Sequence, residues 1–208
     1  MGHGSDIQRL ETTATYDPAT ETFIINSPTI SSAKWWIGDL GVYCTHAAMF
    51  AQLIIGEKSH GLHAFLVPIR DPKTFKPLPG VEVGDIGPKQ GFMTKDNGYC
   101  LISNMRIPRK NMLMKFHVVS KEGKYSLQGD EKISYATMLV TRSGLTRLVG
   151  SMYSKIVTII TRYSLLRKQF KDEKGEEIPV LDYQTQQAKV ISRIGELFGY
   201  IATSKAIT

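Results

Sequence analysis

The strongest constraint on this sequence is a proline-free stretch from Ser134 to Phe170 with the apolar spacing of a helix. Steps of three and four residues bring apolar side chains to one helical face. That stripe consists of Met138, Leu145, Val149, Met152, Ile156, Ile159, Tyr163 and Leu166. Gly150 weakens the helix interior. The pattern predicts one long amphipathic helix.

A second helix is expected after a charged, turn-like segment from Lys171 to Pro179. Asp182 is a suitable N-cap for it. Its stripe contains Tyr183, Gln187, Val190, Ile194, Leu197 and Ile201. Because each helix has one apolar face and the chain offers few others, the pair needs further packing partners.

Residues 1–131 have a different pattern, in which short β-prone segments are separated by glycine and proline turns. Such segments include 12–16, 23–26, 63–68, 81–83, 98–102 and 105–108. The apolar run from Cys44 to Ile55 fits either a helix or a buried strand, and Gly56 after it favours a central strand. Many short strands with such turns predict an antiparallel barrel or sandwich. The sequence therefore predicts an α+β chain with a β-domain at 1–131 and a helical domain at 132–208.

Composition narrows the class of protein. The net charge is +7, but lysines and arginines are spread along the chain and form no run of five or six. A basic nucleic-acid-binding module needs clustered cations with exposed aromatics, and we exclude it for that reason. Cys44 and Cys100 predict two free thiols in a reducing compartment. No apolar run approaches 18 residues, so we expect no membrane span.

The termini indicate a piece of a longer polypeptide. The first residues, Met1 to Asp6, do not resemble a signal peptide and have the composition of a loop interior. The chain also stops within a predicted helix at Thr208.

The pair Trp35-Trp36 contains both tryptophans of the chain and leads into Gly38 and Gly41. Tryptophan offers a large flat face that suits stacking on a planar ring system. Glycine lets a backbone approach a ligand closely. A strand that carries core aromatics into a turn fits the same pattern, so the residues alone leave both interpretations open.

Several stretches together resemble the acyl-CoA dehydrogenase and oxidase superfamily. Residues 2–14, with Gly-His-Gly-Ser-Asp and Thr-Thr-Ala, resemble its Thr-Glu-x-Gly-x-Gly-Ser-Asp…Thr-Thr-Ala signature, and 34–41 resemble its Trp-Ile-x-x-Gly-Gly stretch. Residues 167–170 resemble its Arg-x-x-Phe helix end, and 182–184 its following glutamine. Stretches that favour the peroxisomal acyl-CoA oxidases within the superfamily are 61–70, 77–81, 85–89, 96–99 and 106–114.

This resemblance implies a middle β-domain followed by the first helices of a C-terminal α-helical bundle. It implies FAD-dependent desaturation of a fatty acyl-CoA in a peroxisomal homodimer, with molecular oxygen reduced to hydrogen peroxide. The alternative is an acyl-CoA dehydrogenase that passes its electrons to an electron-transfer flavoprotein. The family's catalytic glutamate lies in a later part of the chain, and no residue here matches it. We therefore assign no catalytic residue and expect the chain alone to be inactive.

By the same resemblance, Trp36 and Gly38 lie along the isoalloxazine ring of FAD. We assign Trp35 to the core, because adjacent strand positions face opposite ways. Gly4 and Ser5 offer backbone N–H groups and a hydroxyl to a phosphate or pantetheine group of the cofactor or substrate. An ordinary turn has the same composition as these two residues.

The helical segment carries four further candidates. Arg142 shares the apolar stripe and either contacts the CoA side of the substrate or forms an intramolecular ion pair. Arg167 is expected to reach the FAD pyrophosphate of a neighbouring subunit, the alternative being a cation at its own helix C-terminus. Gln169 and Gln184 join the adenine-side contact. Four histidines have no spacing that suggests a metal site, and we expect structural roles for them: His46, His60, His63 and His117.

Overall fold

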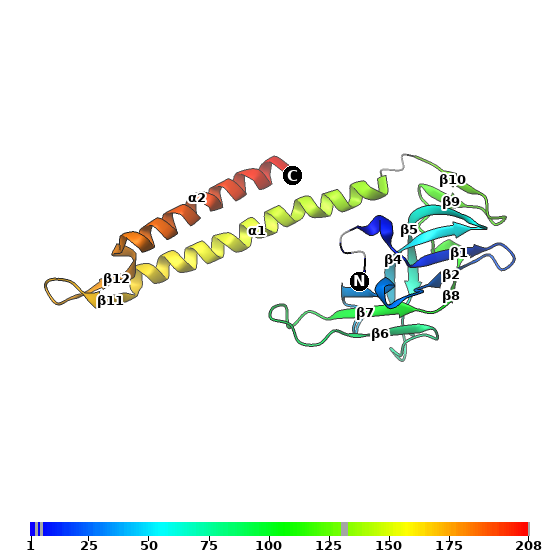
Figure 1. The fold of residues 1–208 in the computed structure, drawn as a ribbon, viewed down its shortest axis with the longest axis horizontal. Coiled ribbons are helices and arrows are strands. Elements are labelled where there is room, and N and C mark those ends of the chain that lie inside the picture. The colour runs from blue at the N-terminus through cyan, green and yellow to red at the C-terminus, as the bar shows by residue number, and fades with distance from the viewer. Residues whose placement is uncertain (3, 5, 130–132, 208) are drawn as a thin grey trace. The chain divides into compact units, whose positions relative to one another are not determined.

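The computed structural model describes residues 1, 2, 4, 6–129 and 133–207, except for the side chains of 133–138. Contacts divide the chain into two compact units, Met1–Asp130 and Glu131–Thr208. Figure 1 shows that strands make up most of the first unit and a pair of long helices most of the second.

The first unit contains two main sheets. The five-stranded sheet has the order β5-β4-β1-β2-β8. Its strands are β1 (Thr13–Asp17), β2 (Thr22–Asn26), β4 (His46–Ile55), β5 (Lys58–Pro68) and β8 (Met105–Pro108). The three-stranded sheet has the order β3-β7-β6. Its strands are β3 (Lys34–Gly38), β6 (Val81–Asp85) and β7 (Asn97–Ile102), and a separate hairpin joins β9 (His117–Val119) to β10 (Tyr125–Leu127). Short 3-10 helices span Ile7–Arg9, Ile30–Ser32 and Arg109–Asn111.

The two main sheets share one apolar core. Burial alternates along β1 and β2, as expected for strands with one face on a core. Phe23 and Ile25 on β2 and Phe65 on β5 meet Cys100 and Ile102 on β7 in a single buried cluster. In the described residues the main sheets stay separate, so the sandwich form of the prediction holds and no barrel closes.

The apolar run after Cys44 forms β4, and its predicted central position is confirmed. β4 pairs with β5 on one side and with β1 on the other. The β1–β4 pair is parallel, which differs from the predicted antiparallel arrangement. A parallel pair needs a long crossover, and here the chain passes through β2 and β3 before β4 begins.

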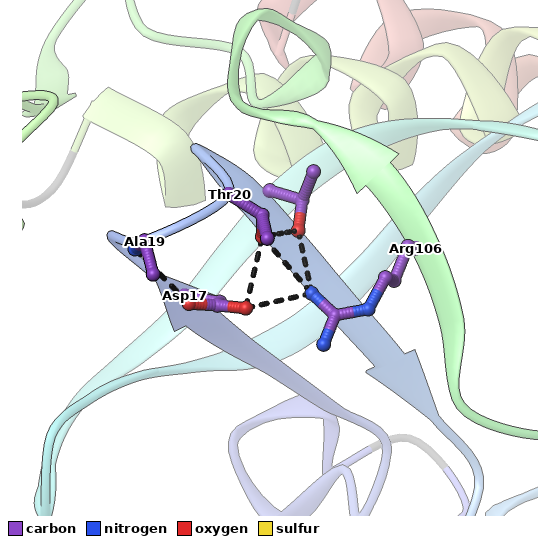
Figure 2. A network of polar contacts seen from close by, with 5 residues as sticks. Asp17, Ala19, Thr20 and Arg106 are labelled. Carbon is purple, nitrogen blue, oxygen red and sulfur yellow. Dashed lines mark hydrogen bonds and ion pairs between the residues drawn. The ribbon is translucent and has the colours of Figure 1, made fainter.

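Arg106 on the edge strand β8 forms hydrogen bonds with the turn of the β1–β2 hairpin. Figure 2 shows the Arg106 guanidinium beside the Asp17 carboxylate and the Thr20 hydroxyl, with Nη1 at 2.8 and 3.0 Å from these oxygens. The same carboxylate accepts a hydrogen bond from the Ala19 amide. The hydrogen bond from Arg106 is the main reason why the pKa of Asp17 is lowered.

The second unit consists of α1 (Ile133–Leu166) and α2 (Gln184–Ile207), joined by a hairpin of β11 (Lys168–Lys171) and β12 (Glu177–Pro179). Both predicted helices are confirmed, but their ends differ. α1 stops before Phe170 because 168–171 pairs with β12 instead. A 3-10 turn, Val180–Asp182, precedes α2, so Tyr183 separates Asp182 from the helix and the predicted N-cap is wrong.

The two helices lie side by side (Figure 1) and meet along a narrow strip. Among the α1 side chains that the structure describes, the buried ones are at Gly150, Val157 and Ser164, seven apart, and Val190 and Ser204 are buried on α2. Spacing by seven is typical of helices that pack at a shallow angle. The predicted α1 stripe is not part of this strip: Ile159 is 65% and Leu166 82% exposed. Among the described helices, none has the length and apolar character needed to cross a membrane.

Candidate functional site

The first unit contains a cavity of about 500 Å³ beside β3. Its walls come from three segments: the N-terminal residues, β3 with the turn after it, and the first half of β4. They include Gly4, Leu10, Trp35, Ile37, Leu40 and Met49. Apolar walls with few polar groups are typical of sites for small molecules and cofactors.

A β-bulge shapes the wall that β3 contributes. Trp35 pairs with Tyr99 and Ile37 with Gly98, so Trp36 is the extra residue, and its φ is +69°. A bulge re-aims the side chains around it. Trp35 is 45% and Trp36 56% exposed. The prediction that Trp35 is a core residue is therefore wrong, because the bulge breaks the alternation on which it relied.

Trp35 lines the cavity, a role that the sequence did not predict. Its ring stacks on Tyr99, with centroids 5.7 Å apart and an interplanar angle of 25°. The sequence offered no signal for it, since a left-handed bulge position is normally recognised by a glycine. Trp36 lies beside this wall, and its carbonyl oxygen accepts a hydrogen bond from Asn97 Nδ2 at 3.2 Å.

Lys34 is a second wall residue that the sequence did not indicate. Its ammonium is shielded from solvent and has no hydrogen-bond partner in the described part of the chain. Burial lowers the pKa of Lys34 to about 8. Its neighbour across the ladder is Cys100, and burial raises the pKa of that thiol to about 12. The cavity wall thus includes an ammonium group that loses its proton more readily than an ordinary lysine.

Of the described candidates in this unit, Gly4 lines the cavity, whereas Trp36 and Gly38 are not among its wall residues. Gly38 ends β3 and is exposed. Gly4 lines the cavity, with φ at +54° and no atom within 4 Å of the place a side chain would take. Gly2 anchors this segment by donating to the Ser31 carbonyl at 2.8 Å. Ser5 lies outside the described residues, so its predicted contact stays a prediction.

The remaining candidates belong to the helical unit. Arg167 follows α1, and its guanidinium donates to Gln169 Oε1 at 2.8 Å. Tyr183 donates to the Gln169 carbonyl at 2.9 Å. Gln184 is exposed at the first position of α2, and Arg142 is exposed on α1. In the described residues Arg142 forms no ion pair, so its intramolecular alternative is not observed.

Three of the chain's five histidines form a ring cluster with Tyr125. His60 and His63 lie on β5, and His117 lies on β9. Their ring centroids lie 4.4, 5.5 and 6.2 Å from that of Tyr125, in this order. No group of three or more His, Cys, Asp or Glu side chains in the described ranges could hold a metal ion.

Comparison with known proteins gives consistent matches. Residues 135–208 match the family model described as acyl-CoA oxidase, C-alpha1 domain. Peroxisomal acyl-coenzyme A oxidase 1 of Cavia porcellus is 52% identical over 207 residues, which is 99% of this chain and 30% of that protein. The chain therefore spans about 30% of the length of such curated relatives.

The solved structures that resemble this chain are also acyl-CoA oxidases. Arabidopsis thaliana acyl-CoA oxidase 1 superposes with a TM-score of 0.94 at 39% identity, over 99% of this chain and 32% of that one. Acyl-CoA oxidase-2 of Caenorhabditis elegans, bound with FAD, ascaroside-CoA and ATP, gives a TM-score of 0.92 at 42% identity. That match covers 99% of this chain and 31% of the nematode chain.

Proposed function

We propose that this chain, a homologue of a segment of the acyl-CoA oxidases, forms part of the flavin and acyl-CoA site of such an enzyme. The observation that carries the proposal is the 52% identity that extends over 99% of the chain, the cavity segments included. The reaction is α,β-desaturation of a fatty acyl-CoA to the trans-2-enoyl-CoA, the first step of peroxisomal fatty acid β-oxidation. The expected location is the peroxisome, as in the names of the curated relatives.

The residues around the cavity fit a flavin. Isoalloxazine is a flat ring system with a polar edge, and the cavity of about 500 Å³ has apolar walls. Trp36 offers a ring that is 56% exposed, and at Gly38 a side chain would meet only the end of Lys95. We infer that Trp36 and Gly38 hold the ring, while Trp35 and Ile37 exclude water. FAD, when bound, supplies hydride acceptance from the acyl β-carbon and the reduction of oxygen to hydrogen peroxide.

The polar parts of cofactor and substrate are assigned to other residues. Gly4 and Ser5 bind a phosphate or pantetheine group through backbone N–H groups and a hydroxyl. Arg142 contacts the CoA side of the substrate, since its cation is exposed without an ion pair in the described residues. These contacts orient the acyl chain, which is the main contribution that binding residues make to a cofactor-dependent reaction.

Arg167 serves a neighbouring subunit in a homodimer. Its guanidinium is exposed and is oriented by Gln169, which supports a bidentate contact with the pyrophosphate of FAD. Gln169 and Gln184 complete the adenine-side contact. The β-domain at 1–131 is the middle domain of the enzyme, and 132–208 forms the first helices of its C-terminal domain, in agreement with the family match at 135–208.

No catalytic base is assigned within the chain, so the 208 residues alone are inactive. Oriented proton transfer by a base commonly contributes about 10² to 10⁴-fold to the rate. The chain should produce no hydrogen peroxide above the free-flavin background when it is supplied with FAD and a long-chain acyl-CoA. Sustained turnover would show that a carboxylate within these residues acts as the base.

The function is tested in the whole protein that carries this chain. Stoichiometric hydrogen peroxide and enoyl-CoA support an oxidase, and reduction of an electron-transfer flavoprotein without peroxide supports the dehydrogenase alternative. Trp36→Ala should weaken FAD retention and shift the visible flavin band. Phe92→Ala is the matched control, because Phe92 is an exposed aromatic residue that lies outside β3. Arg167→Ala should lose FAD and loosen the dimer together.

A further inference from the structure

The turn after β3 is held from both sides by charged residues that the proposed function does not use. This turn, defined here as residues 39–44, follows Gly38 and leads into β4. Asp39 has a φ of +63°, and the Cys44 amide donates to the Asp39 carbonyl at 2.8 Å. The other backbone groups of the turn need partners elsewhere, because buried backbone groups are rarely left unpaired.

Arg70 provides partners for the carbonyl groups. It lies just after β5 and is 4% exposed. Nη1 donates to the Leu40 carbonyl at 2.9 Å and to the Cys44 carbonyl at 3.1 Å. Nη2 donates to the Gly41 carbonyl at 2.5 Å. A buried guanidinium is costly without partners, and here the turn itself provides three of them.

Asp96 provides partners for the amide groups. Its Oδ2 accepts hydrogen bonds from the amides of Val42 at 2.8 Å and Tyr43 at 3.1 Å. Its backbone carbonyl accepts from the Asp39 amide, also at 2.8 Å. The carbonyls of the turn thus face a cation and its amides face an anion. Hydrogen bonds to charged groups are stronger than neutral ones.

The turn packs closely against β7. A side-chain carbon on Gly98 would overlap the backbone of Leu40 and Gly41, so the main chain of the turn lies directly against the main chain of β7 at this point. Apart from Gly41, Leu40 is the buried residue of the turn, at 2% exposure, and it forms part of the cavity wall. The position of that wall therefore depends on Arg70 and Asp96.

We propose that Arg70 and Asp96 are positioning residues of the flavin site, which fix the turn at 39–44 and through it the Leu40 wall and the Trp36–Gly38 end of β3. The inference rests on the proposed function, in which FAD occupies this cavity. Neither residue contacts the cofactor; each acts through the backbone that it holds.

The experiment compares Arg70→Met, Arg70→Lys and Asp96→Asn with the unaltered whole protein. Amide exchange at Val42 and Tyr43 reports on the turn, and the FAD dissociation constant with the visible flavin band reports on the site. Arg70→Met should speed exchange and raise the dissociation constant by about 10- to 100-fold, the range expected when hydrogen bonds to a charged group are lost. Arg70→Lys should restore it in part, since an ammonium lacks the planar fork of donors.

Arg106→Met is the matched control. Arg106 also donates to three oxygens, those of Asp17, Thr20 and Thr22, but at the β1–β2 hairpin (Figure 2). It should leave FAD affinity and the flavin band unchanged. If Arg70→Met does not fold, Asp96→Asn tests the same proposal through the amide groups of the turn at 39–44. Asparagine keeps the size of the side chain and one acceptor oxygen, but it removes the negative charge.

Two results would overturn the proposal, and they differ from each other. Faster exchange at Val42 and Tyr43 with unaltered FAD affinity and spectrum would show that the turn does not position the cofactor. An unaltered protein that binds no FAD would refute the proposed function itself, and this inference with it.

Discussion

In the β unit Phe23, Ile25 and Phe65 are fully buried, whereas in the helical unit Ile159 and Leu166 are 65% and 82% exposed. Both sets of residues are strongly apolar and regularly spaced in the sequence. They differ in the number of layers around them. Two sheets enclose the first set, whereas the one neighbouring helix packs on other residues of α1 and leaves the second set uncovered in the described residues.

The comparison shows that periodicity identifies an apolar face but not what covers it. A helix can bury an apolar stripe about 100° wide only when more than one neighbour packs on it. α1 uses Gly150, Val157 and Ser164 against α2, and these lie between the positions of its predicted stripe. The described residues therefore leave the stripe exposed, and the need of the helix pair for more packing partners stays a prediction.

The largest expected difference is seen when the units are produced separately. Residues 1–129 should unfold cooperatively on heating, because their core is complete. Residues 133–207 should self-associate, because their exposed apolar faces are extensive. Circular dichroism melting and sedimentation velocity measure both properties. A monomeric helix pair with a sharp transition would contradict the comparison.

Truncating one side chain in each unit sharpens the same contrast. In the 208-residue chain, Phe65→Ala should lower the free energy of unfolding by about 3–5 kcal/mol, because it leaves a cavity beside Phe23. The two rings meet edge to face with centroids 5.1 Å apart. Ile159→Ala should change it by less than about 0.5 kcal/mol. Denaturant unfolding measures both, and equal losses would mean that the α1 stripe is covered after all.

Lys34 is a destabilising residue inside the well-packed unit, because its buried ammonium has no hydrogen-bond partner among the described residues. Replacing it should raise the free energy of unfolding. Burial lowers the pKa of Lys34 to about 8, against an ordinary value of 10.5. The unfolded state therefore binds more protons between these pH values, and the free energy of unfolding rises with pH across that window. Lys34→Met should remove this rise and stabilise the unit at pH 7 by roughly 1 to 3 kcal/mol.

Lys58→Met is the control for that variant, since Lys58 is exposed on β5. Chemical denaturation of the unaltered chain and both variants at pH 7 and at pH 10 supplies the six values needed. A Lys34→Met chain that is less stable at pH 7 would show that the ammonium has a partner in solution.

How far the sequence predicts this structure depends on the range of each interaction. The long helices and the inner strand β4 follow from local periodicity, and they were predicted. The end of α1 was not, because 168–171 has helical composition yet pairs with Glu177–Pro179 across a hairpin.

The candidate site shows the same limit. The exposed Trp36 and Gly38 were singled out through the resemblance of residues 34–41 to the superfamily, but the bulge that turns Trp35 into a wall residue carries no sequence signature. Arg70 was not predicted as part of the site either. Its partners lie 26 to 30 residues away, and nothing in the composition of a strand end indicates which carbonyls it will meet.

The smallest expected effect concerns a polar group inside the well-packed unit. His63 is buried on β5 at 5% exposure, with Nδ1 at 3.1 Å from the Gly61 carbonyl oxygen. Because a carbonyl can only accept, Nδ1 carries a proton. In the neutral ring Nε2 then accepts from the Tyr125 hydroxyl at 3.2 Å. The same hydroxyl lies 2.7 Å from Nδ1 of His117. Protonating His63 would place a donor against that hydroxyl and a charge beside His117 and His60.

Burial is the main reason why the pKa of His63 lies below its ordinary value of 6.5, and His117 and His60 lower it further, while the bond to Gly61 opposes them. The unfolded chain therefore takes up a proton at a higher pH than the folded one. Stability should be lost as the pH falls below about 6.5, until the folded pKa is passed. The free energy of unfolding at pH 7.5 and pH 5 should differ less in His63→Gln than in the unaltered chain. His46→Gln, at an exposed position, should keep the full difference, and an equal pH dependence in all three chains would show that His63 is not the group responsible.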